Sequence, residues 1–293
     1  MTNFRKSRYQ RYLMGGAVAL AMMAVPLAAH ATPYAYASNQ ITNLFITNGS
    51  GAPYPTISSS ENIYNTATYN NLTSGTSNTG NLDAALTAPQ AYQGPDATPP
   101  AAVYTADGPT FTGTRALADI GAFGATGSSV NNAAEGYGNG DGSSTAKNDA
   151  TIEFTVTGTG AALTVAFNDI VNLAASTAAL NGETATASVL NLFSLTDASG
   201  NSVFAPTNLG AINKQVSSIN GQLVNPYTSN AAYSFTTPTL TSGAIYTVSL
   251  TSSSTESIST PVPEPGSLIL LGTGLIGLGL VLKRKNAKRG NLV

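Results

Sequence analysis

The residue types that perform most protein chemistry are nearly absent from this chain of 293 residues. It has no cysteine, no tryptophan and one histidine, His30. The rest of the chain therefore cannot build a Ser-His-Asp or Cys-His arrangement, or a zinc or copper site of thiolates and imidazoles. Carboxylates remain, and two of them could hydrolyse a glycoside. Since no spacing singles out such a pair, we predict no catalytic residue and no enzyme.

One glycine-rich segment carries oxygen ligands at close spacing. Its donors are Asn139, Asp141, Ser143 and Asp149, and calcium prefers roughly six to eight oxygens. The segment lacks the terminal bidentate Glu of an EF-hand loop. A plain polar loop accounts for the same residues, and we favour that interpretation. We therefore predict no metal site and no cofactor, with calcium as the open alternative.

Tyrosine is the aromatic residue most available for contact with sugars. Tyr54, Tyr64, Tyr69 and Tyr92 are scattered through a polar stretch rich in Asn, Thr, Ser and Pro. Their rings could stack on a glycan, but tyrosines also pin loops to a domain through the ring and the hydroxyl. We favour the second role.

The N-terminus has the order of a secretory signal peptide. Basic residues precede an apolar run, 13–28, which ends in the small-x-small pattern Ala29-His30-Ala31. This order predicts cleavage by signal peptidase after Ala31, so that 1–31 is removed. Ala35-Tyr36-Ala37 is a second candidate cleavage pattern.

The C-terminus combines a proline-rich element, an apolar run and a basic cluster. Pro263, Glu264 and Pro265 precede the run, and Lys283, Arg284 and Lys285 follow it. As a helix, 268–282 covers roughly 22 Å, somewhat less than the roughly 30 Å hydrocarbon core. We predict a single transmembrane helix whose basic residues stop transfer and remain cytoplasmic, which places the preceding residues outside the inner membrane.

This C-terminal order resembles the sorting signal of PEP-CTERM proteins of Gram-negative bacteria that make extracellular polysaccharide. The resemblance implies that exosortase, a membrane protease, recognises Pro263, Glu264 and Pro265 and removes the tail. The inner membrane would then hold the protein transiently, before it reaches the cell surface or the medium. An ordinary C-terminal anchor is the alternative.

Charge separates the two ends from the part between them. Of twelve Lys and Arg residues, only Arg115, Lys147 and Lys214 lie between the two signals. The mature part is therefore acidic and would repel phosphate backbones, so nucleic acid is not an expected partner. Polyanionic glycans are disfavoured unless divalent cations bridge them.

The middle of the chain is typical of an all-β fold. Strand patterns separated by Gly, Asn and Ser turns predict an antiparallel β-sandwich, jelly-roll-like, with long polar loops. We expect a loop-rich part with short strands over 32–110, a sandwich body over 111–260 and the sorting signal over 261–293. A hairpin is expected around 158–160, and 197–201 should form a second turn. The strand candidates are 41–47, 112–123, 151–157, 163–168, 185–196, 202–204, 231–235 and 244–251.

These observations favour an exported, exosortase-processed cell-surface or extracellular-matrix protein with a structural or adhesive role. The resemblance associates it with exopolysaccharide and biofilm. A calcium-dependent glycan-binding module is the first alternative, and a carboxylate-pair glycosidase is the second.

Overall fold

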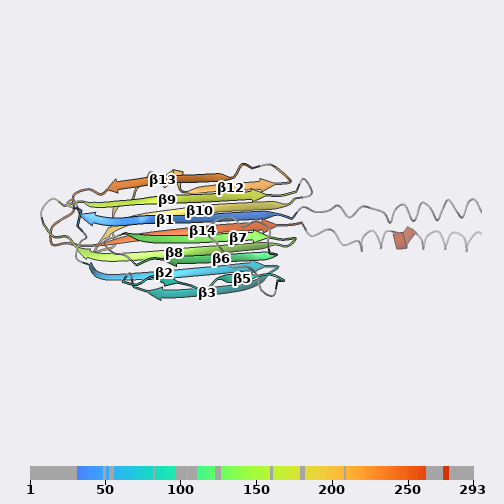
Figure 1. Ribbon diagram of the computed structural model, residues 1–293, viewed down its shortest axis with the longest axis horizontal. Helices are drawn as coiled ribbons and strands as arrows, with labels where there is room; N and C mark the ends of the chain where they lie inside the picture. Colours follow the sequence, from blue (N-terminus) through green and yellow to red (C-terminus); the bar gives the residue numbers. More distant parts are fainter. Residues whose placement is uncertain are drawn as a thin grey trace, which may run out of the picture. The chain divides into compact units, whose positions relative to one another are not determined.

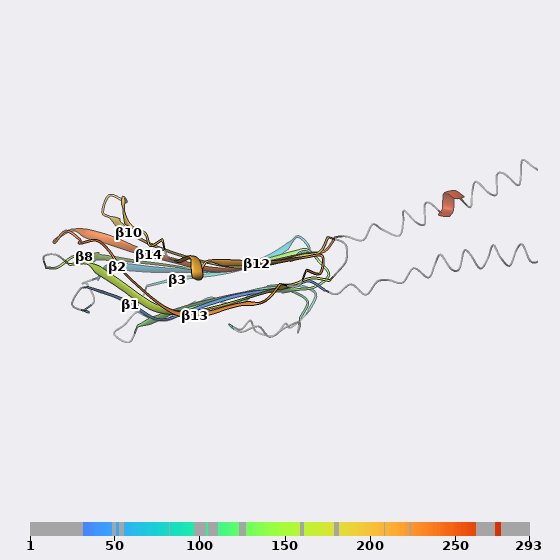
Figure 2. The ribbon, with the colours of Figure 1, turned by 90° about the horizontal axis from the view of Figure 1, so that it is seen from above.

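The computed structural model contains two antiparallel β-sheets that pack face to face (Figures 1 and 2). Both sheets belong to one compact unit, Thr32–Val293, which is separate from Met1–Ala31. The residues that the structure describes are 32–48, 51–52, 56–81, 83–96, 104, 111–122, 127–158, 161–178, 182–207, 209–222, 224–261 and 273–276.

Sheet A has the strand order β13-β9-β1-β7-β6-β4, and β5 also pairs with β6. Every pairing in it is antiparallel. The strands are β1 (Tyr34–Asn48), β4 (Leu86–Thr87), β5 (Ala91–Gln93), β6 (Gly113–Ile120), β7 (Ser128–Tyr137), β9 (Leu163–Ser176) and β13 (Tyr227–Thr236).

Sheet B has the order β11-β10-β14-β8-β2-β3, and β12 also pairs with β10. It too is antiparallel throughout. The strands are β2 (Thr56–Tyr69), β3 (Leu72–Gly80), β8 (Gly142–Thr155), β10 (Thr184–Asp197), β11 (Ser202–Phe204), β12 (Lys214–Ile219) and β14 (Ile245–Ser259). A short 3-10 helix, η1 (Leu209–Ala211), lies between β11 and β12.

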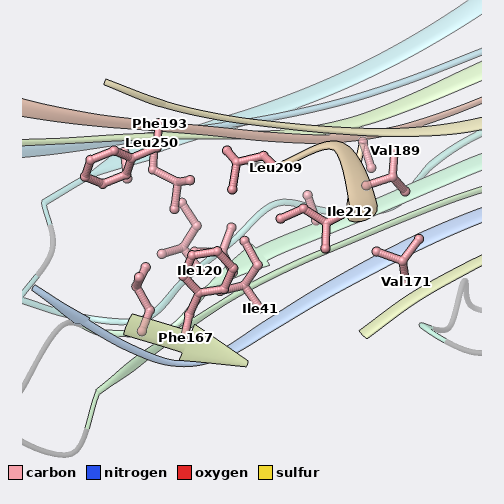
Figure 3. Close-up of a cluster of buried hydrophobic side chains, with 14 of the residues drawn as sticks. Ile41, Ile120, Phe167, Val171, Val189, Phe193, Leu209, Ile212 and Leu250 are labelled. Atoms are coloured by element: carbon pink, nitrogen blue, oxygen red, sulfur yellow. The ribbon is translucent and has the colours of Figure 1, made fainter. Parts of the chain in front are cut away.

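Alternation of side chains along each strand creates the two layers. In β9 and in most of β14, every second residue is buried, as expected for strands with one face on a core and the other toward solvent. Figure 3 shows apolar side chains from both sheets meeting between the layers, among them Phe167, Phe193 and Leu250.

The first and last strands meet at the same end of the sandwich, which we call the terminal end. The Gly138 amide donates to the carbonyl of Pro33, directly before β1. Asp141, which follows in the same turn, accepts hydrogen bonds from Ser259 and Thr260 at the end of β14. We call the opposite end the distal end.

The predicted all-β antiparallel class is confirmed, and several of its details are too. Strands β6, β10 and β11 lie where the sequence predicts them. The turn 197–201 also forms, with the Gly200 amide donating to the carbonyl of Asp197. The jelly-roll subtype stays a prediction.

Other details of the prediction were wrong. Long loops with short strands were expected over 32–110, but β1, β2 and β3 together supply three long strands there. The expected hairpin around 158–160 does not form, because β8 pairs within sheet B and β9 within sheet A. That connection therefore crosses from one layer to the other.

Candidate functional site

The residues predicted to direct processing lie outside the described part of the chain. The structure does describe the points from which the chain leads toward them, residues 32 and 261. The undescribed residues are Ala29, Ala31, Pro263, Glu264, Pro265, Lys283, Arg284 and Lys285.

A hydrogen-bonded anchor holds the end of β14, just before the proline-rich element. The Oδ1 atom of Asp141 accepts the Ser259 hydroxyl at 2.8 Å and the Thr260 amide at 3.1 Å. The Asp141 carbonyl accepts the Asn70 amide at 2.8 Å, which links the same turn to β2. The chain therefore leaves the sandwich from a fixed point at the terminal end.

One candidate calcium ligand, Asp141, is part of the anchor, and two more, Ser143 and Asp149, lie on strand β8. Ser143 and Asp149 are six residues apart on β8, roughly 20 Å along an extended strand. Asp149 is engaged by Lys147 at 2.6 Å and by the Thr251 hydroxyl at 2.6 Å. Among the described residues, no group of three or more His, Cys, Asp or Glu could hold a metal ion. The candidate ligands Ser143 and Asp149 are therefore not brought together.

Three carboxylates point into the sandwich. The sequence alone had singled out none of them. Glu61 and Asp169 are 0 % exposed and Glu256 is 3 % exposed. Because burial disfavours the charged form, it raises the pKa of Glu61 and Asp169 to about 7 and that of Glu256 to about 8. Neither carboxylate oxygen of Glu61 or Asp169 has a hydrogen-bond partner among the described residues.

Glu256 occupies space that a missing side chain leaves open. A Cβ atom at Gly136 would lie 2.2 Å from Oε2 of Glu256, so any other residue there would collide with the carboxylate. Glu135, next along β7, adds a negative charge that also raises the pKa of Glu256, while the neighbouring Ser144 partly offsets the shift.

Glu135 itself belongs to a buried ion pair on the outer side of sheet A. Arg115, which is 0 % exposed, donates to Oε2 of Glu135 through Nη2 at 2.5 Å and Nε at 3.1 Å. The guanidinium carbon also lies 4.3 Å from the ring centroid of Phe111, and Tyr34 donates to Oε1 of Glu135. A glycosidase needs a pair of carboxylates that a sugar can reach, and Glu135 and Glu256 are both buried.

Between the sheets runs a layer of side-chain amides and hydroxyls, which we call the polar belt: Asn39, Asn132, Asn191, Ser252 and Ser254. The Ser252 hydroxyl accepts Asn39 and Asn132, each at 2.8 Å, and donates to Oδ1 of Asn191 at 2.8 Å. Ser254 hydrogen-bonds Oδ1 of Asn132. These contacts fasten β1 and β7 of one sheet to β10 and β14 of the other.

Of the tyrosines considered for sugar contact, Tyr64 is the one that the structure leaves exposed, at 42 %. It lies on the outer face of sheet B, with the Lys147 ammonium 5.9 Å from its ring centroid. Tyr69 is buried, Tyr92 donates its hydroxyl to the Thr112 carbonyl, and Tyr54 lies outside the described residues.

Hydroxyl side chains elsewhere on the outer face of sheet B hydrogen-bond across strands. Ser60 meets Thr151 at 2.6 Å, and Ser188 meets Thr255 at 2.5 Å. We call this surface the hydroxyl face.

Comparison with known proteins addresses the segment that follows the anchored end of β14. The family model described as the PEP-CTERM protein-sorting motif matches residues 261–285. The chain carries a PEP-CTERM sorting motif. The PEP-CTERM motif indicates an exported protein that exosortase processes, with transient membrane anchoring beforehand. No curated protein and no solved structure matches the chain.

The transmembrane helix predicted within the PEP-CTERM motif falls mostly outside the described residues. Residues 273–276 are described and are helical. No helix within the described part is both long and apolar enough to cross a membrane.

Sequence reasoning missed the anchor and the polar belt. Asp141 was considered only as a metal ligand, although an Asp between a turn and a strand also accepts amide hydrogen bonds. The sequence contains one sign of the belt, which is that Asn residues occur inside otherwise strand-like segments. Without the pairing register, that signal does not tell the inner face from the outer one.

Proposed function

We propose that this protein is an exported cell-surface or extracellular-matrix domain, released by exosortase, with a structural and non-catalytic role. The observation that carries the proposal is the position of the two ends. Residue 32 follows the predicted signal peptide, residue 261 begins the sorting motif, and both lie at the terminal end of the sandwich. While the tail is held in the inner membrane, the distal end is the part that points away from it.

The start of β1 supports signal peptidase cleavage after Ala31 rather than after Ala37. Tyr34 pairs with Tyr137 on one side and Ser176 on the other, so β1 is a central strand from its first residue. Cleavage after Ala37 would remove Tyr34–Ala37, the first four residues of this central strand of sheet A. A mature chain beginning at Thr32 keeps that strand whole.

The length of the strands supports a structural role. β1 and β14 have 15 residues each, which spans roughly 50 Å. With two such sheets fastened together, the domain would be a stiff spacer between the cell envelope and its surroundings. Exopolysaccharide is the surrounding material that we propose, and nucleic acid is not a proposed partner because Arg115 and Lys147 already contact acids.

The hydroxyl face favours glycan binding as a second candidate function. Tyr64 offers a ring, and serines and threonines on the same face of sheet B offer donors and acceptors for sugar hydroxyls. Glycan-array binding by the released protein, lost in Tyr64→Ala and kept in Tyr227→Ala, would support this candidate. Repeating the array with a chelator tests the calcium-dependent form, and no binding in either condition would contradict both forms.

The first experiment for the main proposal is the intact mass of the protein from the producing bacterium, measured separately in membrane and surface or medium fractions. We expect surface material that begins near Thr32 and ends near Pro263. Glu264→Ala should keep its tail and stay in the membrane fraction, whereas Asp83→Ala, which changes an exposed acid, should behave as the parent.

Retention of 268–293 by the wild-type protein in the membrane would show an ordinary anchor and contradict exosortase release. Recovery of the protein only from the cytoplasm would contradict export.

A further inference from the structure

Strand β3 forms one edge of sheet B and lacks the features that usually protect an edge. Its sequence, Leu72–Gly80, contains no charged residue and no proline, and its pairing with β2 runs without a register shift. Within the described residues, no strand pairs with the other side of β3. Natural edge strands commonly carry a lysine, a proline or a bulge, because unpaired amides and carbonyls invite another strand.

Side-chain hydrogen bonds hold β3 in an extended, regular form. Ser74 and Thr76 donate to the carbonyls of Tyr92 and Pro89, and Asn78 donates to that of Thr87. These bonds use side chains, so they leave the outer backbone groups of β3 available. A strand that is already ordered loses less conformational entropy when another strand adds to it.

Strand β12 forms part of the opposite edge of the same sheet, at the same height. The register places Thr73 of β3 and Ser217 of β12 in one row across the sheet. Next to these positions, Leu72 and Ile219 are 64 % and 48 % exposed, although both side chains are apolar. Lys214 is the one charged residue of β12, and its ammonium lies 5.9 Å from the ring centroid of Tyr227.

The number of strands decides how the two edges are oriented. From β12 through β10, β14, β8 and β2 to β3 there are six strands, each antiparallel to the next. With an even number, the two edge strands run in opposite directions. Two copies standing side by side in the same orientation therefore bring β3 of one antiparallel to β12 of the other.

From these observations we propose that copies of this protein associate side by side, with β3 of one copy pairing antiparallel with β12 of the next and extending sheet B. Figure 1 shows that the strand axes are nearly aligned across the sandwich, so adjacent copies keep nearly the same orientation. Because the two edges are different surfaces, the contact repeats and forms rows of copies rather than closed dimers.

The common orientation rests on the proposed function. If every copy leaves the membrane from its terminal end, all copies stand the same way up, which is the arrangement that the edges require. Confinement to one surface also raises the effective concentration of the edges.

Disulfide cross-linking tests the contact directly, because the chain contains no cysteine. Residues opposite each other in an antiparallel pair have Cβ atoms about 4.5–5.5 Å apart, close to the separation that a disulfide bridges. The double variant Thr73→Cys/Ser217→Cys should give, under mild oxidation, a ladder of dimers, trimers and longer species. The control Thr73→Cys/Ser199→Cys moves the second thiol to the exposed 197–201 turn and should give no ladder.

The experiment is done on surface material and on full-length chains solubilised from the membrane, so that it fails separately from the proposed function. A ladder in solubilised chains with no protein at the surface would contradict export but support the edge contact. A surface-located protein without a ladder would overturn the edge contact and leave export standing.

A further variant distinguishes edge pairing from other contacts. Ser77→Lys, introduced into the double-cysteine chain, places a charge on β3 and should reduce the amount of disulfide-linked oligomers roughly tenfold. An unchanged far-ultraviolet circular dichroism spectrum would show that this variant still folds. An undiminished ladder would overturn the proposal. So would dimers from Thr73→Cys alone, because they would mean that two β3 edges meet.

Discussion

The two halves of the sandwich interior differ in the size and polarity of the side chains that fill them. Toward the distal end the layers are separated by bulky groups such as Phe167, Phe193 and Phe235. Toward the terminal end the facing residues are mainly alanine, serine and glycine, and they include Gly136 and Ser144. Figure 2 shows the layers approaching each other toward the terminal end, as small side chains require.

This difference indicates that the halves are stabilised in different ways. In the distal half, removal of apolar surface from water provides the stabilisation. In the terminal half, little apolar surface is available, and close backbone packing and the polar belt beside it hold the sheets together. The Arg115–Glu135 ion pair joins β6 to β7 within sheet A. The terminal half also contains both exits of the chain, so its geometry bears most directly on processing. Four substitutions in the released protein test this contrast.

The largest effect is expected from Phe235→Ala in the distal half. The Phe235 ring lies 4.7 Å, 5.9 Å and 6.4 Å from the ring centroids of Phe193, Phe204 and Phe167. Its loss should lower the free energy of unfolding by about 3–5 kcal/mol, measured by chemical denaturation. Leu192→Ala, at a side chain that is 51 % exposed, is the control and should change it little. Equal effects would mean that the aromatic cluster is not a core.

The next effect is expected from adding volume to the terminal half. Gly136→Val places carbon where Glu256 lies, so the sheets must separate or the carboxylate must move. We expect a loss of about 1–3 kcal/mol or more in the same measurement. Gly75→Val on β3, where an added Cβ has no neighbour closer than 3.8 Å, is the matched control. If both glycines tolerate valine, close packing of the terminal half is refuted.

A smaller loss is expected when the polar belt is interrupted. Ser252→Ala removes one hydroxyl and leaves Asn39, Asn132 and Asn191 with fewer partners, at a cost of about 1–3 kcal/mol. Ser253→Ala changes the adjacent residue, which faces the other side of β14, and should have little effect. Thermal unfolding of the two variants side by side is the measurement, and equal melting temperatures would contradict a structural role for the belt.

The smallest effect, and the one that depends on pH, concerns the buried acids. Their folded pKa values, about 7 for Glu61 and Asp169 and about 8 for Glu256, lie above the ordinary values of 4.5 and 3.8. When the pH exceeds the ordinary pKa of one of these acids, the unfolded chain releases a proton that the folded chain keeps. The contribution of these three acids to stability is therefore fullest below about pH 4 and is lost as the pH rises to about 8.

We expect the melting temperature of the released protein to decrease between about pH 5 and pH 8. Glu256→Gln, which has no acid to ionise, should flatten part of this decrease, whereas Asp83→Asn at an exposed position should leave it unchanged. A melting temperature that rises over this range would show that the three acids are ionised in the folded protein.

Part of the fold could be predicted because its signals are local. β10 was found from the apolar residues Val189, Phe193 and Leu195, and the 197–201 turn from its Asp, Ser, Gly and Asn residues. β2 and the first half of β8 were missed for the opposite reason. Their inward residues include Glu61, Asn65, Ser144 and Asn148, so hydrophobic alternation is weak where the polar and small-residue half of the core begins.

The sequence by itself determined where the export and sorting patterns of this protein lie, and how few reactive residues it contains. The signal peptide pattern and the PEP-CTERM motif are each a continuous stretch of sequence, and the residues of such a stretch keep their order in any conformation. Only the tertiary structure decided that Asp141 anchors the end of β14, that β8 and β9 belong to different sheets, and that asparagines meet between the layers. Asn39 and Ser252 are 213 residues apart, so their hydrogen bond exists only after both sheets have formed and packed.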